Sequence, residues 1–174
     1  RYAAAIDKAV FPGLQGGPLM HIVAAKAAAF KEAEHPDFVA YQKAILENAR
    51  ALAEELMGQG LNVITGGTDK HLVMVDLTST GVTGQDAESA LSGVNITVNK
   101  NAIPFDPKPA SITSGIRLGT PAITTRGFGV DEIRQIARII ARVITNIDDT
   151  KFHQQAREEV NEMNLRFPTP GITA

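Results

Sequence analysis

The stretch LNVITGGTDKHLVMVDLT, residues 61–78, decides the fold of this 174-residue chain. Before it, apolar residues recur at the helical spacing of three and four. Within it the period falls to two, which is typical of strands. Residues 61–65 and 71–78 are therefore predicted strands, and the GGTD segment at 66–69 predicts the turn that joins them.

Helical patterns lie on both sides of this stretch, and further extended segments follow it. Thr83 followed by Asp86 resembles a helix-capping pair. An apolar stripe from Ile133 to Ile147 indicates the clearest helix of the chain. The other predicted elements are helices at 1–10, 19–34, 37–57, 87–91 and 149–165, strands at 94–99 and 115–119, and a Pro-rich loop at 102–112.

This order of elements predicts an α+β fold, with helices packed on one face of a small, mostly antiparallel sheet. The helix at 19–34 is apolar nearly all round, which is typical of a helix buried against something larger. We therefore expect residues 1–35 to be the end of a large domain with its connecting helix, and residues 36–174 to form a C-terminal small domain. Because the chain starts at Arg1 without an initiator Met, we also expect that its true N-terminus is missing.

Composition excludes several classes of function. The chain has no cysteine, so disulfides, thiolate zinc sites and a cysteine nucleophile are excluded, and a cytoplasmic location fits. A formal net charge of -2 gives no sign of a nucleic-acid binder. No apolar run has the length of a membrane span. The four histidines lack metal-ligand spacing, so we predict no metal site and assign them structural or solvated roles.

Two features suggest sites for anions. Gly16 and Gly17 precede a predicted helix, where backbone N–H groups can approach a phosphate, although an ordinary turn is the commoner reason for such a pair. Arg117 lies between Ile116 and Leu118 on a predicted strand. Its planar guanidinium matches a carboxylate through two parallel hydrogen bonds, as an amino-acid or keto-acid substrate would need. Pairing with a structural Asp or Glu is an equally good reading of Arg117.

A third feature is Asn101, where a predicted strand meets the Pro-rich loop. Its amide can donate and accept hydrogen bonds, and so can read the edge of a heterocycle. A turn-forming role is the commoner one for such an Asn. Taken together, the residues indicate part of a site for a phosphorylated cofactor and a small acid, without a nucleophile, a base or an electron sink.

Several blocks of the sequence resemble one family, serine hydroxymethyltransferase. The first is AVFPGLQGGPLMH at 9–21. The others are GGTD at 66–69 with His71, ITVNKN at 96–101, and TSGIR at 113–117 running on to GTPAIT at 119–124, followed by Arg126, Gly127 and Phe128. The resemblance covers nearly the whole chain in order.

The resemblance implies an enzyme that interconverts serine and glycine, with tetrahydrofolate as the one-carbon carrier and pyridoxal 5'-phosphate as the cofactor. It implies the aspartate-aminotransferase-like fold (fold type I) and a homodimer or tetramer. By this resemblance Arg117 binds the substrate carboxylate, and Gly16 and Gly17 reach the phosphate of the partner subunit's cofactor. Asn101 contacts the folate, as does the loop around Pro109, Ala110 and Ser111.

The sequence departs from the family pattern in two places. The loop often reads Ser-Pro-Phe in the family and here reads Pro109-Ala110-Ser111, so a ring contact from that Phe is lost. The lysine that holds the cofactor lies upstream of this segment in the family. We therefore expect that the chain alone is inactive and that Lys100 does not replace that lysine. The alternatives are a fragment of a related fold type I pyridoxal-phosphate aldolase, or a non-catalytic α+β module that binds small molecules.

Overall fold

The structure is a computed structural model that describes residues 1–171. The chain divides into two compact units, Arg1–Ala40 and Tyr41–Ala174. The boundary between these units in the sequence falls within the first turns of helix α3 (Pro36–Gly58), and the domain boundary expected at 35/36 stays a prediction.

The first unit consists of helices and the turns between them. It contains α1 (Ala3–Lys8), the π-helical turn η1 (Ala9–Leu14), and α2 (Met20–Ala33). Phe11 interrupts η1 with an extended backbone, and its peptide bond to Pro12 is cis. No residue of α1, η1 or α2 is buried, so the burial predicted for the apolar helix at 19–34 is not seen in the described residues.

The second unit holds the sheet, and most of its elements lie where the sequence predicted them. Thr83 caps α4 as expected, since its Oγ1 accepts a hydrogen bond from the Asp86 N–H at 3.1 Å. After α3, its elements are β1 (Asn62–Val63), η2 (Ile64–Gly66), β2 (Leu72–Asp76), η3 (Thr78–Thr80), α4 (Gly84–Gly93), β3 (Asn99–Asn101), β4 (Gly115–Gly119), α5 (Pro121–Thr125), α6 (Val130–Thr145) and α7 (Thr150–Arg166).

The four strands form one sheet in the order β1-β2-β4-β3, and every neighbouring pair is antiparallel. The prediction of a small antiparallel sheet is therefore confirmed. The register pairs Met74 of β2 with Arg117 of β4, and Arg117 with Asn99 of β3. Residues paired across neighbouring strands point to the same face, so these three side chains form a row.

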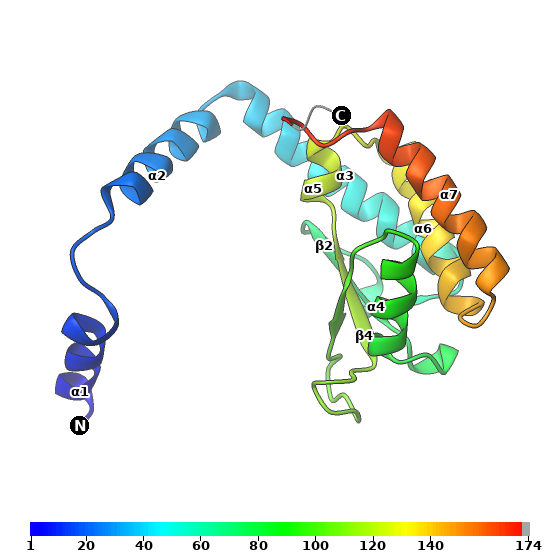
Figure 1. Cartoon of the computed structure of the whole chain (residues 1–174), viewed down its shortest axis with the longest axis horizontal. Helices are drawn as coiled ribbons and strands as arrows, with labels where there is room; N and C mark the ends of the chain where they lie inside the picture. Colours follow the sequence, from blue (N-terminus) through cyan, green and yellow to red (C-terminus); the bar gives the residue numbers. More distant parts are fainter. Residues whose placement is uncertain (172–174) are drawn as a thin grey trace. The chain divides into compact units, whose positions relative to one another are not determined.

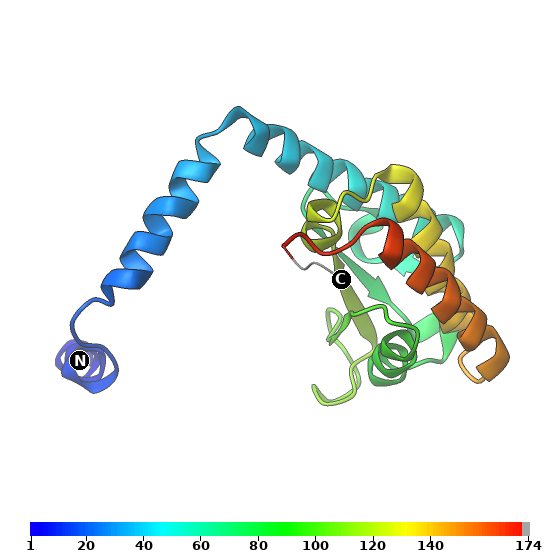
Figure 2. The same cartoon turned by 45° about the horizontal axis from the view of Figure 1, so that its top comes forward.

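The two faces of the sheet have different surroundings. Val73, Val75, Ile116 and Leu118 are buried and point toward the helices. Helices α3, α4, α6 and α7 lie on that side, as two views of the fold show (Figures 1 and 2). The prediction that helices cover one face is confirmed. We call the opposite side, which carries the row with Arg117, the open face.

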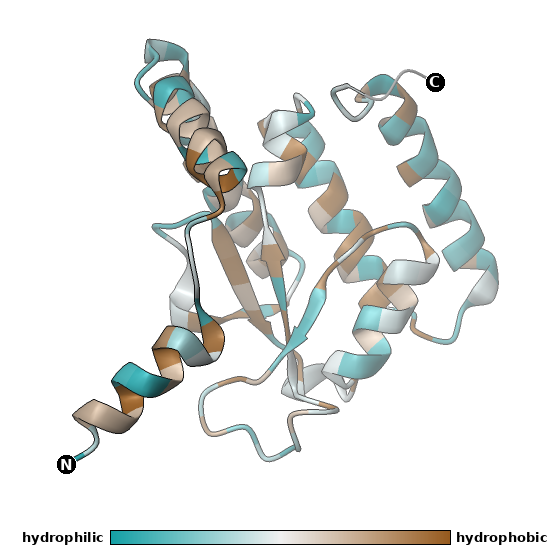
Figure 3. Ribbon diagram, turned by 60° about the vertical axis from the view of Figure 1, so that its left-hand side comes forward, coloured by the Kyte–Doolittle hydropathy of each residue, from teal (hydrophilic) through white to brown (hydrophobic). Residues whose placement is uncertain are grey.

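The core lies between the sheet and α6. The predicted apolar stripe of α6 is buried, including Ile133, Ile140 and Val143, while α7 beside it consists largely of hydrophilic residues (Figure 3). Buried Asn48 of α3 donates hydrogen bonds to Thr124 Oγ1 and to the Phe128 carbonyl, both at 2.9 Å. This amide therefore fixes the short helix α5 at the end of β4.

Candidate functional site on the open face of the sheet

Arg117 projects from the middle of β4 onto the open face. Because Ile116 and Leu118 point into the core, the alternation of the strand directs Arg117 outward. The side chain is exposed, and no carboxylate among residues 1–171 lies within ion-pair distance of it. Within the described chain the guanidinium therefore has no structural acid to neutralise, and its hydrogen-bonding fork is available to a ligand.

The surface around Arg117 is hollowed. One hollow of about 380 Å³ is lined by His71, Leu72, Thr97, Val98, Asn99, Arg117, Leu118 and Gly119. His71 is the side chain here that the sequence analysis missed, because it was assigned a structural or solvated role. Its position directly before β2, the neighbour of β4, brings it to the same hollow as Arg117.

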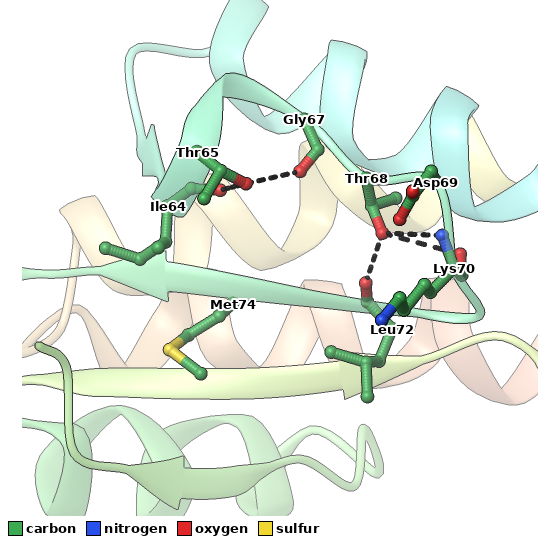
Figure 4. A pocket seen from close by; sticks show the side chains of 8 residues that line it. All are labelled: Ile64, Thr65, Gly67, Thr68, Asp69, Lys70, Leu72 and Met74. Carbon is green, nitrogen blue, oxygen red and sulfur yellow. Dashed lines mark hydrogen bonds between the residues drawn. The ribbon is translucent and has the colours of Figure 1, made fainter.

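A second hollow, of about 570 Å³, continues from Leu72 along β2 (Figure 4). It is lined by Ile64, Thr65, Gly67, Thr68, Asp69, Lys70, Leu72 and Met74. Thr68 Oγ1 donates to the Leu72 carbonyl at 2.8 Å and accepts from the Lys70 N–H at 3.1 Å, so the predicted turn is tied to the start of β2. The open face is thus bordered by an ordered polar turn.

Asn101 lies at the end of β3, on the same face as Arg117. Its backbone pairs with Gly115, two residues along β4 from Arg117. Its Nδ2 donates to the Ala102 carbonyl at 2.8 Å and contacts Met74 Sδ at 3.9 Å. These bonds orient the amide and leave its Oδ1 without a hydrogen bond in the described chain. The Asn101 Oδ1 can therefore accept a hydrogen bond from an N–H group of a ligand.

Lys100 lies on the other face of the sheet. Its Nζ is 3.4 Å from Glu88 Oε2 of α4, and its backbone N–H donates to Glu88 Oε1 at 2.9 Å. The backbone hydrogen bond from Lys100 is the largest cause that lowers the pKa of Glu88, and it outweighs the opposing effect of burial. The Lys100 side chain is thus held against α4 by Glu88, on the face opposite Arg117.

The loop that follows β3 is organised by Asp106, which the sequence analysis did not identify. Its Oδ2 accepts hydrogen bonds from the N–H groups of Ile103 at 3.1 Å and Ser114 at 2.8 Å. Its Oδ1 accepts from Lys108 N–H at 2.9 Å and from Ser114 Oγ at 2.7 Å. Burial raises the pKa of Asp106, but these hydrogen bonds, led by that of the Ser114 hydroxyl, lower it to about 2.

The loop residues predicted to contact folate lie beyond this carboxylate. Pro109, Ala110 and Ser111 are all exposed. The Pro109 carbonyl accepts hydrogen bonds from the Ile112 and Thr113 N–H groups at 2.9 and 3.0 Å. The segment is therefore a closed turn on the surface, open to solvent on its outer side.

Gly16 and Gly17 belong to the first compact unit, and Arg117 and Asn101 to the second. Both glycines are exposed, and a side chain at either would meet no atom within 4 Å. They precede Leu19, which stands at the start of α2 without a side-chain cap. Accessible backbone N–H groups before an uncapped helix suit an anion such as a phosphate.

Residues 1–171 contain no group of three or more His, Cys, Asp or Glu side chains that can hold a metal ion. None of the helices among them is both long and apolar enough to cross a membrane.

The structure is therefore an α+β domain in which one face of a small antiparallel sheet exposes polar side chains. The family model described as serine hydroxymethyltransferase matches residues 1–140. The chain belongs to the serine hydroxymethyltransferase family, a family of transferases of serine, glycine and one-carbon metabolism. Its sheet and helices fit the C-terminal domain of the fold type I enzymes, and members of the family generally depend on pyridoxal phosphate and tetrahydrofolate.

Proposed function

We propose that this chain is the C-terminal portion of a glycine hydroxymethyltransferase, which interconverts serine and glycine with tetrahydrofolate as the one-carbon carrier. Family membership supports the proposal. The observation that carries it is the exposed Arg117, which has no acidic partner in the described chain and lies in a hollow of the open face. An unpaired guanidinium on an ordered strand suits a substrate that carries a carboxylate.

In this proposal Arg117 binds and orients the carboxylate of serine or glycine. A rigid strand fixes the guanidinium, so that two parallel hydrogen bonds align the amino acid. Pyridoxal phosphate, when bound, supplies the electron sink for negative charge on the substrate α-carbon. The lysine that holds this cofactor is not Lys100, because Lys100 pairs with Glu88 on the other face.

Asn101 and the exposed turn at Pro109, Ala110 and Ser111 contact the folate. The Asn101 Oδ1 is the free acceptor that a ring N–H requires. Gly16 and Gly17 bind the phosphate of a cofactor held by the partner subunit, in a homodimer or tetramer. We further propose that the enzyme works in the cytoplasm.

The test is the Arg117→Lys variant of the full-length enzyme. Lysine keeps the charge but loses the planar fork, so we expect the KM for serine and glycine to rise by about 10- to 100-fold, as the loss of about 1.5–3 kcal/mol would give. Arg50→Lys is the matched control, because Arg50 is exposed on α3 and has no partner in the described chain. Kinetics of Arg117→Lys equal to those of the control would remove Arg117 from the site.

A further inference from the structure

Phe105 combines two features that are unusual for an apolar residue, full exposure of the side chain and a positive φ. Its side chain is fully exposed, and it is the one aromatic residue in the loop at 102–112. Its backbone has a φ of 57°, in the left-handed region that residues other than Gly, Asn and Asp seldom adopt. An exposed ring and a strained backbone are both unfavourable, and such strain is concentrated at functional sites.

The backbone around Phe105 explains how the strain is held. The Asp106 N–H donates to the Ile103 carbonyl at 3.1 Å, which closes a β-turn with Pro104 and Phe105 as its central residues. Proline favours the first central position, and a positive φ at the second normally selects Gly or Asn. The turn geometry alone therefore does not account for a Phe here.

Asp106 anchors this turn to the sheet. Its carboxylate accepts backbone hydrogen bonds from Ile103, before the ring, and from Ser114, directly before β4. Phe105 thus projects from a short turn, and the carboxylate at the end of that turn ties it to the residue before β4. Such a support lets a ring be presented to a ligand with little further loss of conformational entropy.

The turn lies at the end of the sheet that carries Asn101. Ile103 lies two residues after Asn101, and its Cγ2 is 2.7 Å from the position that a Cβ on Gly115 would occupy. Asp106 is also close to Asp76, on the open-face side of β2. Burial raises the pKa of Asp76, local hydrogen bonds lower it below its ordinary value, and the charge of Asp106 opposes this lowering. The turn that carries Phe105 therefore lies at the Asn101 end of the sheet.

We propose that Phe105 is a specificity-determining contact for the one-carbon carrier, and that its ring packs against the planar ring system of that ligand. This inference rests on the proposed function, because it assumes that Asn101 contacts the same ligand. A Phe ring gains by offset stacking on a flat conjugated ring, which serine and glycine do not have. The contact should therefore strengthen the binding of the carrier and leave the binding of the amino acid unchanged.

The test compares Phe105→Asn and Phe105→Tyr in the full-length enzyme. Asn relieves the backbone strain but removes the ring, so we expect the KM for tetrahydrofolate to rise by about tenfold, with the KM for serine unchanged. The midpoint of thermal unfolding should stay the same or rise. Tyr keeps the ring and should restore the wild-type KM for tetrahydrofolate.

The control is Leu165→Asn, since Leu165 is also a strongly exposed apolar residue but lies on α7. It should leave the KM for tetrahydrofolate unchanged. An unchanged KM in Phe105→Asn would overturn the inference alone. So would a lowered unfolding midpoint with equal loss of folate-dependent and folate-independent activity, because the ring would then pack against the rest of the protein. A wild-type enzyme without folate-dependent transfer would overturn both the inference and the proposed function.

Discussion

Lys100 and Arg117 lie on neighbouring strands, one step apart in register, and point to opposite faces of the sheet. Arg117 pairs with Asn99, whereas Lys100 pairs with Ile116, whose side chain is in the core. Because successive side chains of a strand point to opposite faces of the sheet, the two cations lie on different faces. Arg117 is left free on the open face, while Lys100 pairs with Glu88 of α4.

From this separation we predict that Lys100 forms no stable adduct with pyridoxal phosphate. The ion pair with Glu88 holds the Lys100 Nζ against α4, so this amine is not presented to a ligand on the open face. Treatment of the chain with pyridoxal phosphate and borohydride, followed by peptide mapping, should give no selective modification of Lys100.

Glu88→Gln provides the control for this experiment. Removal of the carboxylate should make Lys100 more reactive, and its modification should approach that of exposed Lys70. A selective adduct at Lys100 in the wild-type chain would contradict the proposed role of this residue as a structural ion pair.

A second prediction concerns Asn101. Replacement by Ala removes the free Oδ1 acceptor without disturbing the ladder between β3 and β4, which is made by backbone groups. In the full-length enzyme, Asn101→Ala should lower kcat/KM for tetrahydrofolate by about tenfold, as the loss of one hydrogen bond to a ligand would give. Folate-independent cleavage of a bulkier 3-hydroxy amino acid should change little. Equal losses in both reactions would argue against a contact with folate.

The elements that the sequence predicted best are those whose local pattern and tertiary packing agree. The strand at Gly115–Gly119 and the helix α6 follow clear periods of 2 and 3.6, and both are observed. Arg117 was identified because a charged residue between apolar neighbours on a short strand needs a partner, and its planar guanidinium matches a carboxylate.

Two elements were predicted wrongly for physical reasons. The strand expected at 94–99 begins only at Asn99, because Val94 ends α4 and Asn95 adopts a φ of 64°, so these residues do not enter the ladder. The helix α5 at Pro121–Thr125 was not predicted. Its Thr-rich sequence has low helix propensity, and its position depends on the distant Asn48.

Asp106 could not be recognised as the organiser of its loop. An Asp that precedes Pro107 in a Pro-rich segment indicates a turn, and nothing more. Its role depends on Ser114, eight residues later, whose N–H and hydroxyl both donate to the carboxylate where the chain enters β4. Such a contact follows from the register of the sheet, which the local sequence does not specify.

The same carboxylate leads to a prediction about acid stability. Its pKa in the folded protein is about 2, below the ordinary value of 3.8. Because the folded-state value is depressed, the unfolded chain binds more protons between these two pH values. The stabilisation by Asp106 should therefore be fully present above pH of about 5 and be lost progressively as the pH falls from about 3.8 toward about 2.

Urea unfolding of the wild-type chain and Asp106→Asn, between pH 6 and pH 3, measures this effect. Asn can accept from the Ile103 and Ser114 N–H groups through Oδ1, but its NH2 group, in the place of the second carboxylate oxygen, cannot accept from the Lys108 N–H. We therefore expect Asp106→Asn to be less stable than wild type at pH 6, and the difference to narrow toward pH 3 because protonation weakens only the wild-type carboxylate. Asp148→Asn is the matched control, since Asp148 is an exposed acid between α6 and α7 whose carboxylate has no hydrogen bond or ion pair in the described chain. A difference between wild type and Asp106→Asn that stays constant down to pH 3 would show that the ionised carboxylate does not hold this loop.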